Sequence, residues 1–255
     1  AFKRTYQMVL NEVKKIILGT KKYGGYSYFS WIPTVFYSVN NYNFLRKIGV
    51  EPKEIKEYKV VYFPLHLEPE QSLLSLSPEF GNITEAIHLI SKNLPCDYVL
   101  VLKEQPFCFA VRDKIFYRQM SQIGNIFFAK PEISSHRWIN AADIVIAITG
   151  TVGIEAIYEN KFVLSFGKHQ IINYLPSVHY VRNYSEVSDA IRGILNSRVD
   201  SDVLSQSKKI IKKSQFEVSF TLKEYKYSIH DSSLCIDLAM KTIENLMITH
   251  RDIFI

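Results

Sequence analysis

The chain has 255 residues, of which 47% are hydrophobic and 22% are charged, as is typical of a folded protein that buries a sizeable core. Its formal net charge of +6 favours anionic partners, such as nucleotides, acidic glycans or a membrane surface. No block of Lys and Arg is long enough, or sufficiently mixed with aromatic residues, to predict nucleic-acid binding. The sequence shows no apolar run of membrane-spanning length and no signal-peptide pattern.

The cysteines at Cys96, Cys108 and Cys235 are widely spaced and match no metal-binding spacing. They favour a reduced, cytoplasmic setting, and we expect no metal site. The chain begins with Ala1 rather than Met, so one interpretation is that it lacks an N-terminal part.

The N-terminal segment, 1–58, is expected to precede the main domain. Residues 2–18 carry apolar side chains at helical spacing with Lys and Arg opposite, which predicts an amphipathic helix. Residues 19–58 are aromatic and irregular and predict a linker, with a short helix-like run that ends at Gly49. Whether the basic helix contacts a membrane, the C-terminal helices or a second copy stays open, with packing on protein favoured.

Strand and helix patterns alternate over 59–200, which predicts an α/β domain with a doubly wound parallel sheet. Asn82 with Glu85 predicts a capping box, and Asp113 and Ser134 or Ser135 predict two further helix caps. A helical extension is expected over 201–255, with breaks near 214 and 231. The expected strands are 59–65, 97–103, 125–129, 143–148, 162–166 and 178–181, and the expected helices are 82–94, 113–123, 134–142, 151–159 and 185–197.

Polar residues gather where the expected strands end, and ligands of open parallel sheets bind beyond these carboxyl ends. We therefore expect a site along one edge of the sheet, although each residue alone has a structural explanation. Glu104, for example, could simply pair with Lys103 or Arg112. The strand-end groups are His66, Glu68 and Glu70; Lys103 to Pro106; Lys130 to Glu132; Thr149 to Thr151; and Gly167 to His169.

The run 143–156 reads DIVIAITGTVGIEA and organises the chain around one turn. A buried strand that passes through Thr149, Gly150, Thr151 and Gly153 into a helix presents free backbone amides and the positive end of the helix dipole. Such a turn suits a phosphate or carboxylate. The alternative, that the two glycines only allow a tight turn and close helix packing, stays open.

The charges around this turn indicate how an anionic ligand could be held. Lys103 or Arg112 could neutralise a phosphate, and His66 is a candidate general acid or base. Glu155 could accept a hydrogen bond from a ribose hydroxyl or support the helix N-terminus. The turn is neither a Walker A motif nor a G-x-G-x-x-G motif, so a nucleotide linked to a sugar fits better than ATP hydrolysis or NAD chemistry.

Three runs resemble the capsule polysaccharide biosynthesis family, which includes bacterial Kdo transferases. They are YFPLHLEPEQSLL (62–74), VLVLKEQP with the later Arg112 and Phe116-Tyr117, and ADIVIAITGTVGIEAIYENKFVLSFG (142–167), in the family's order. The resemblance implies the donor-binding, Rossmann-like half of a B-type glycosyltransferase fold. It also implies a nucleotide-sugar donor, CMP-Kdo or a related one, with no further cofactor, and a glycan or glycolipid acceptor.

The family has Lys-Glu-His-Pro where this chain has Lys103-Glu104-Gln105-Pro106. The resemblance implies that the histidine contacts the donor phosphate, and glutamine can donate a hydrogen bond there but cannot carry positive charge. The expected catalytic residues are therefore His66, Glu104 and Gln105, in a protein that is slow, uses another acid or is inactive.

Two function hypotheses follow. The first is a glycosyltransferase that works in the cytoplasm or at the cytoplasmic face of the inner membrane and grips the phosphate through Thr149, Gly150, Thr151 and Gly153, beside Lys103 and Gln105. The second is a non-catalytic nucleotide-sugar or glycan binding module in a polysaccharide synthesis complex. A sugar-nucleotide epimerase is a weaker third alternative.

Overall fold

The computed structural model describes residues 31–68, 75, 77–168, 170–197 and 201–213. The chain divides into two compact units, Ala1–Ser205 and Gln206–Ile255. The expected boundaries near residues 58 and 200 stay predictions. The predicted helix over 2–18 and most of the predicted C-terminal helical extension lie outside the described residues.

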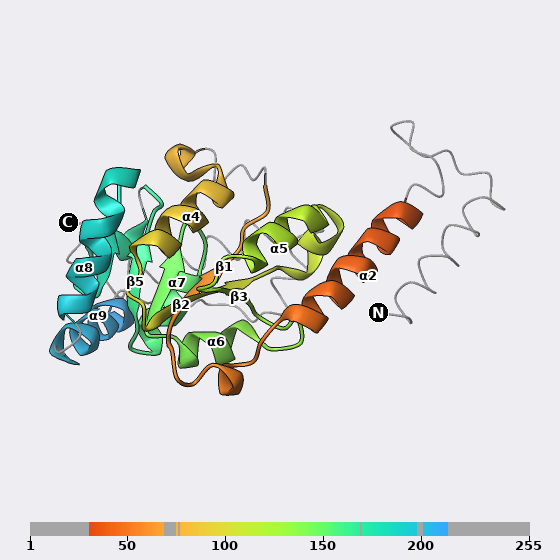
Figure 1. The fold of residues 1–255 in the computed structure, drawn as a ribbon. Coiled ribbons are helices and arrows are strands. Elements are labelled where there is room, and N and C mark those ends of the chain that lie inside the picture. Colours follow the sequence, from red (N-terminus) through yellow and green to blue (C-terminus); the bar gives the residue numbers. More distant parts are fainter. Residues whose placement is uncertain (1–30, 69–74, 76, 169, 198–200, 214–255) are drawn as a thin grey trace, which may run out of the picture. The chain divides into compact units, whose positions relative to one another are not determined.

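A parallel sheet of six strands forms the centre of the first unit, with helices around it (Figure 1). The strand order is β3-β2-β1-β4-β5-β6. The chain builds outward from β1 to β3, then returns to the other side of β1 with β4 and continues to β6. The predicted doubly wound parallel sheet is confirmed. Its strands are β1 (Lys59–Pro64), β2 (Tyr98–Lys103), β3 (Ile126–Phe128), β4 (Ile144–Ala147), β5 (Phe162–Ser165) and β6 (Val178–Tyr180).

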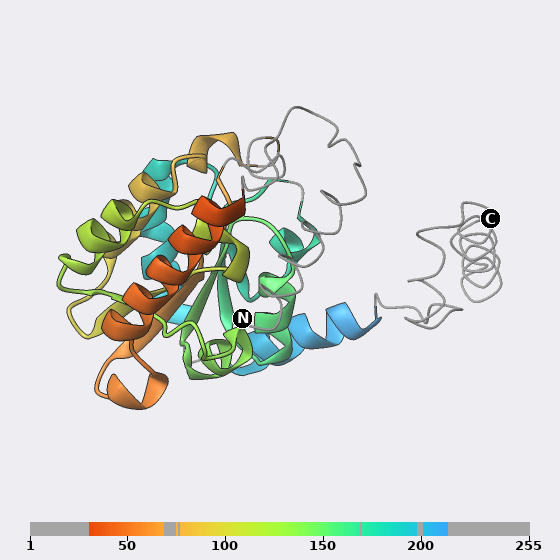
Figure 2. The same ribbon diagram turned by 90° about the vertical axis from the view of Figure 1, so that its right-hand side faces the viewer.

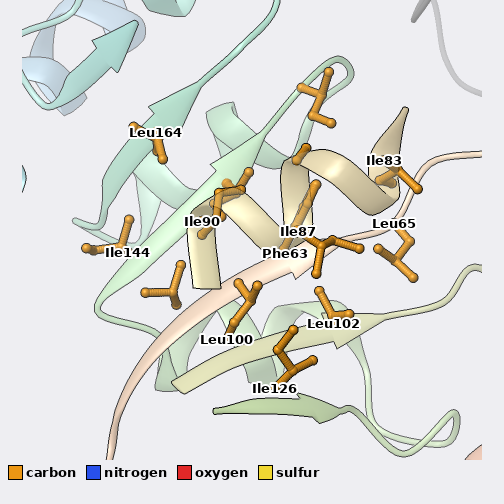
Figure 3. Packing of buried hydrophobic residues seen from close by; sticks show 14 of the residues in the cluster. Phe63, Leu65, Ile83, Ile87, Ile90, Leu100, Leu102, Ile126, Ile144 and Leu164 are labelled. Atoms are coloured by element: carbon orange, nitrogen blue, oxygen red, sulfur yellow. The ribbon is translucent and has the colours of Figure 1, made fainter. Parts of the chain in front are cut away.

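Helices cover both faces of the sheet, which explains why the central strands are apolar without alternation. Helices α4 (Ile83–Asn93), α5 (Lys114–Ser121) and α8 (Val187–Ser197) contribute to one buried cluster with strand residues. Figure 3 shows part of this cluster, in which Phe63 and Leu100 of the strands lie near Ile87 of α4. Helices α6 (Ser135–Ala141) and α7 (Val152–Tyr158) pack against β1, β4 and β5 on the opposite face. There the ring of Tyr62 stacks on Trp138, with centroids 6.5 Å apart.

The predicted helix caps are present at α5 and α6. The Asp113 carboxylate accepts from the Ile115 amide at 2.8 Å, and the Ser134 hydroxyl accepts from the Arg137 amide at 3.3 Å. At α4, Asn82 accepts from the Glu85 amide at 3.4 Å, which is one half of the predicted capping box.

The predicted linker contains a longer helix than expected, because α2 runs from Trp31 to Ile48. Pro33 lies in its first turn, where the missing amide costs no intrahelical hydrogen bond. Its sequence lacks a clear apolar stripe: Phe36 and Tyr37 are exposed, whereas Leu45 is buried. Figure 2 shows α2 in red to orange as a continuous helix, and it packs against the short 3-10 helix η3 (Pro106–Ala110).

The last elements follow the predicted pattern with shifted boundaries. The helix expected from Ser185 begins as a 3-10 turn, η5 (Tyr184–Glu186), which Asn183 caps, and continues as α8. Helix α9 covers Ser201–Lys213. Within the described part of the chain, no helix combines the length and the apolar character needed to cross a bilayer.

Candidate functional site

A pocket of about 720 Å³ lies at the carboxyl ends of β1, β2 and β4. Ligands of doubly wound sheets bind where the strand order reverses, and here that point lies between β1 and β4. The volume falls within the roughly 300–1,000 Å³ that small-molecule sites usually have. We call this cavity the switch-point pocket.

Eight of the ten predicted site residues line the switch-point pocket, so residues from three separate strand ends share one cavity. They are His66, Lys103, Glu104, Gln105, Thr149, Gly150, Thr151 and Glu155. Arg112 and Gly153 are described residues outside its lining.

Lys103 is the last residue of β2 and is 9% exposed. Its only hydrogen bond within the described part of the chain is a long one, 3.4 Å, to the carbonyl oxygen of Pro131. Burial lowers the pKa of the Lys103 ammonium, and the charge of Glu132 opposes that shift. Glu132 itself pairs with Arg46 at 2.8 Å. The pocket wall therefore holds a buried cation with little compensation, which an anionic ligand could supply.

Glu104, the next residue, is fully engaged by protein donors. Its Oε2 accepts from Arg112 Nε at 2.7 Å and from the Tyr117 hydroxyl at 2.9 Å, and its Oε1 accepts from the Gln105 amide at 3.0 Å. Burial and the Glu104 charge raise the pKa of the Tyr117 hydroxyl, so it remains a donor. This arrangement fixes the loop after β2 and leaves the carboxylate little freedom to transfer protons.

Arg112 connects the loops that follow β1 and β2. Besides Glu104, its Nη1 donates to Glu68 Oε2 at 2.6 Å, and its Nη2 donates to the carbonyl of His66. Glu68 in turn accepts from the Ile83 amide at the start of α4, at 2.9 Å. Burial lowers the pKa of Arg112, but the two carboxylates outweigh it and the pKa is raised. Arg112 therefore positions the pocket wall, and each of its nitrogen atoms already has a protein acceptor.

His66 lies two residues beyond β1 and is buried at the pocket wall. Because Arg112 binds its carbonyl oxygen, the backbone at this position is held in place. The imidazole can therefore be directed at a ligand from a fixed support, which general acid or base chemistry requires.

The turn after β4 forms the opposite wall. Gly150 has a φ of +91°, a conformation that other residues rarely adopt, although space for a side chain exists there. The side chain of Thr151, the N-cap residue of α7, caps none of the first-turn amides; its hydroxyl donates instead to the side-chain Oε1 of Glu155 at 2.9 Å. The first-turn amides of a helix have no partner inside it. Gly150, Thr151 and Val152 all line the pocket.

Gly153 allows α7 to pack closely against its neighbours just after the turn. A Cβ atom there would lie 2.4 Å from Ile172 Cδ1 and 3.3 Å from the Ala147 Cβ. Close packing between α7 and the loop after β5 therefore accounts for this glycine. This is the alternative that the sequence left open, in which the glycine only allows close helix packing.

The other strand ends make ion pairs away from this pocket. Lys130, after β3, lies 3.2 Å from Glu51 and 3.1 Å from Glu54, and Lys168, after β5, lies 2.5 Å from Glu79. The strand order explains the difference for Lys130, because β3 is two strands away from the switch point. Glu70 and His169 lie outside the described residues.

Several lining residues escaped the sequence prediction. Ser135 at the start of α6 was assigned only as a helix cap, and Phe107 follows the Lys-Glu-Gln-Pro run without a recognisable motif. The exposure of a phenylalanine beside charged residues is visible only in the structure. Leu67 and Val152 were not predicted either, whereas Pro64 and Pro106 belong to strand ends that the sequence had singled out. Within the described ranges, no three His, Cys, Asp or Glu residues are grouped as a metal site would require.

No family model and no curated protein matches this chain. Similar solved structures include Anabaena HepE in complex with UDP-glucose, at 15% identity and a TM-score of 0.48, over 68% of this chain and 48% of that chain. They also include WaaG, a glycosyltransferase involved in lipopolysaccharide biosynthesis, at 15% identity and a TM-score of 0.47, over 74% of this chain and 50% of that chain. A third is KpsC of Thermosulfurimonas dismutans, a β-Kdo 2,7 transferase, at 15% identity and a TM-score of 0.42, over 72% of this chain and 57% of that chain. The chain thus spans about half the length of these proteins.

Proposed function

We propose that this chain is the nucleotide-sugar-binding half of a glycosyltransferase that transfers a sugar to a glycan or glycolipid acceptor. The observation that carries the proposal is the switch-point pocket, in which the buried cation of Lys103 and the Gly150 turn line the same cavity. A phosphate bound there would neutralise the buried positive charge of Lys103 and accept hydrogen bonds from the amides of the turn.

The proposed chemistry is stabilisation of the departing nucleotide phosphate. Fixed positive charge and preorganised amide donors act strongly in a partly buried site, because they need no reorganisation as charge develops. Lys103 supplies the charge, Gln105 a hydrogen bond, and His66 is the candidate for a proton transfer. Glu104 and Arg112 hold these groups in place.

The donor follows from the sequence resemblance rather than from the pocket. We propose CMP-Kdo, or a related nucleotide sugar, as the donor, in the biosynthesis of a capsule or surface polysaccharide. A cytoplasmic location, or one at the cytoplasmic face of the inner membrane, belongs to the same proposal.

A non-catalytic binding module is the second candidate, and Gln105 is the observation that favours it. Glutamine replaces the histidine that the resemblance places at the donor phosphate. Its amide can donate a hydrogen bond but cannot transfer a proton to the leaving group as a general acid. The pocket and its ligand would be the same, without transfer.

Calorimetric titration with CMP, UDP, CMP-Kdo and UDP-glucose, combined with a donor-consumption assay, tests both candidates. Binding with donor consumption supports the transferase, and binding without it supports the module. The variant Gln105→His sharpens the choice, because a general acid typically contributes about 10²–10⁴-fold. A transferase limited by this position should consume donor at least about 10-fold faster in Gln105→His, whereas a module should gain no activity. If none of the four nucleotides binds, both candidates are wrong.

A further inference from the structure

Phe107 is a large aromatic side chain left in solvent at the switch-point pocket. It is 58% exposed, and it is the only Phe, Tyr or Trp among the described residues that line the cavity. An exposed ring at the wall of a charged cavity offers a flat apolar face to a ligand that enters it.

The segment that carries Phe107 is anchored to α2 through the residues that follow it. Phe107 lies in η3, between Pro106 and the buried Cys108 and Phe109. The Asn41 side chain on α2 donates to the carbonyl of Phe109 at 2.8 Å and to that of Arg112 at 2.9 Å. The ring of Tyr42 packs edge-on against Phe109, with centroids 5.7 Å apart.

The chemistry of the pocket lining changes along this short segment. Lys103 provides a buried positive charge, and only four residues later Pro106 and Phe107 provide an apolar surface, which Leu67 extends from the loop after β1. Four residues span at most about 14 Å, so one small ligand can reach both features. A ligand that satisfies both has an anionic part and a flat, weakly polar part.

We propose that Phe107 stacks on the base of the bound nucleotide while Lys103 holds its phosphate. This inference rests on the proposed function. It adds a residue through which the base of the nucleotide contributes to the binding affinity. A phenyl ring offers no hydrogen bond, and every base has an aromatic face, so stacking here gives affinity without selecting one base.

Phe107→Ala is expected to weaken CMP and UDP binding by about 5- to 100-fold, as removal of a stacking ring typically does. Phe107→Tyr should bind both nucleotides with nearly the wild-type affinity, because it keeps the ring. Phe36→Ala is the matched control, since Phe36 is 69% exposed on α2 and outside the pocket lining. Circular dichroism of each variant confirms that it is folded.

Nuclear magnetic resonance of the bound ligand separates stacking from a general loss of affinity. The H5 and H6 protons of CMP should shift upfield on the wild-type protein, and the shift should vanish on Phe107→Ala at saturating protein, whereas ribose 5-phosphate should bind the wild type and this variant equally.

Two outcomes would overturn the stacking proposal while the proposed function stands. One is wild-type CMP binding without an upfield shift of H5 and H6. The other is a loss in Phe107→Ala that affects ribose 5-phosphate as much as CMP, or that affects only sugar-bearing nucleotides. If the wild type binds neither CMP nor UDP, the proposed function itself is wrong and the role of Phe107 is withdrawn with it.

Discussion

Lys103 ends β2 and Arg112 lies in the loop region after it, and the two cationic side chains have different surroundings. The Arg112 side chain is 9% exposed and has acceptors on Glu104, Glu68 and the His66 backbone. Lys103 is also buried but has, among the described residues, one long hydrogen bond, to a backbone carbonyl. Two cations that look interchangeable in the sequence therefore differ in how well protein acceptors satisfy them.

The difference reflects the geometry of the two side chains. A guanidinium group presents several donors in a fixed plane and suits permanent, multidentate pairing, whereas an ammonium group is a compact charge that a ligand can neutralise. We infer that Arg112 builds the pocket wall, at a gain in stability, and that Lys103 is kept for the ligand, at a cost in stability.

Arg112→Met should have the largest effect on stability. Removing one partner of a buried ion pair leaves the other charge uncompensated, which typically costs about 3–5 kcal/mol. Here Glu104, whose side chain is 1% exposed, would lose its cation. Chemical denaturation should show this loss, and Arg192→Met, at an exposed pair with Asp189, should change little. Equal effects at the two positions would contradict the structural role of Arg112.

Lys103→Met should change stability in the opposite direction and raise the free energy of unfolding. A buried charge without a good partner costs about 1–3 kcal/mol, so the variant should be more stable at neutral pH. Because the pKa of Lys103 is lowered in the folded state, the unfolded chain binds more protons as the pH rises through that folded pKa. Wild-type stability should therefore increase, and the advantage of Lys103→Met should shrink, as the pH approaches about 10.4.

Lys56→Met, at an exposed lysine outside the pocket lining, is the control for this pH series. Thermal unfolding at several pH values measures both variants. A loss of stability in Lys103→Met at neutral pH would show that Lys103 has a structural partner.

Gly150→Ala tests the opposite wall of the pocket. A left-handed backbone costs a non-glycine residue about 1–2 kcal/mol, so we expect a loss of that size together with weaker nucleotide binding. Gly124→Ala is the matched control, because a side chain there also meets no neighbour but its φ is not positive. If both alanine variants bind CMP like the wild type, the Gly150 turn does not contact the phosphate.

Lys168→Met should have the smallest effect. Lys168 follows β5 at the edge of the sheet where a site was predicted, but it pairs with Glu79 at a partly exposed position. Exposed pairs contribute little to stability. We expect unchanged nucleotide affinity in calorimetry, and a clear loss would extend the site to β5.

The sequence predicted the strands, most helices and the caps at Asp113 and Ser134, because these depend on local patterns. It could not give the strand order, and that order decides which strand ends meet at the pocket. Thr149 and Lys103 lie there, whereas Lys130, with the same character, lies two strands from the switch point.

The partners of buried charges also escaped sequence analysis. Sequence analysis predicted that either Lys103 or Arg112 neutralises a phosphate. It could not tell them apart, because a side-chain pair 44 residues apart in the chain, such as Arg112 with Glu68, has no local sequence pattern. The length of α2 was missed for a related reason: its aromatic residues are spread around the helix, and tertiary contact with η3 replaces a visible apolar stripe.

The most direct test of this account is the affinity of CMP and UDP for Lys103→Met, measured by calorimetry beside the wild type and Lys56→Met. A charge-assisted hydrogen bond to phosphate contributes about 1.5–3 kcal/mol, so Lys103→Met should bind about 10- to 100-fold more weakly while remaining fully folded. Lys56→Met should bind like the wild type. Unchanged affinity in a folded Lys103→Met protein would contradict the claim that this buried cation is kept for the ligand.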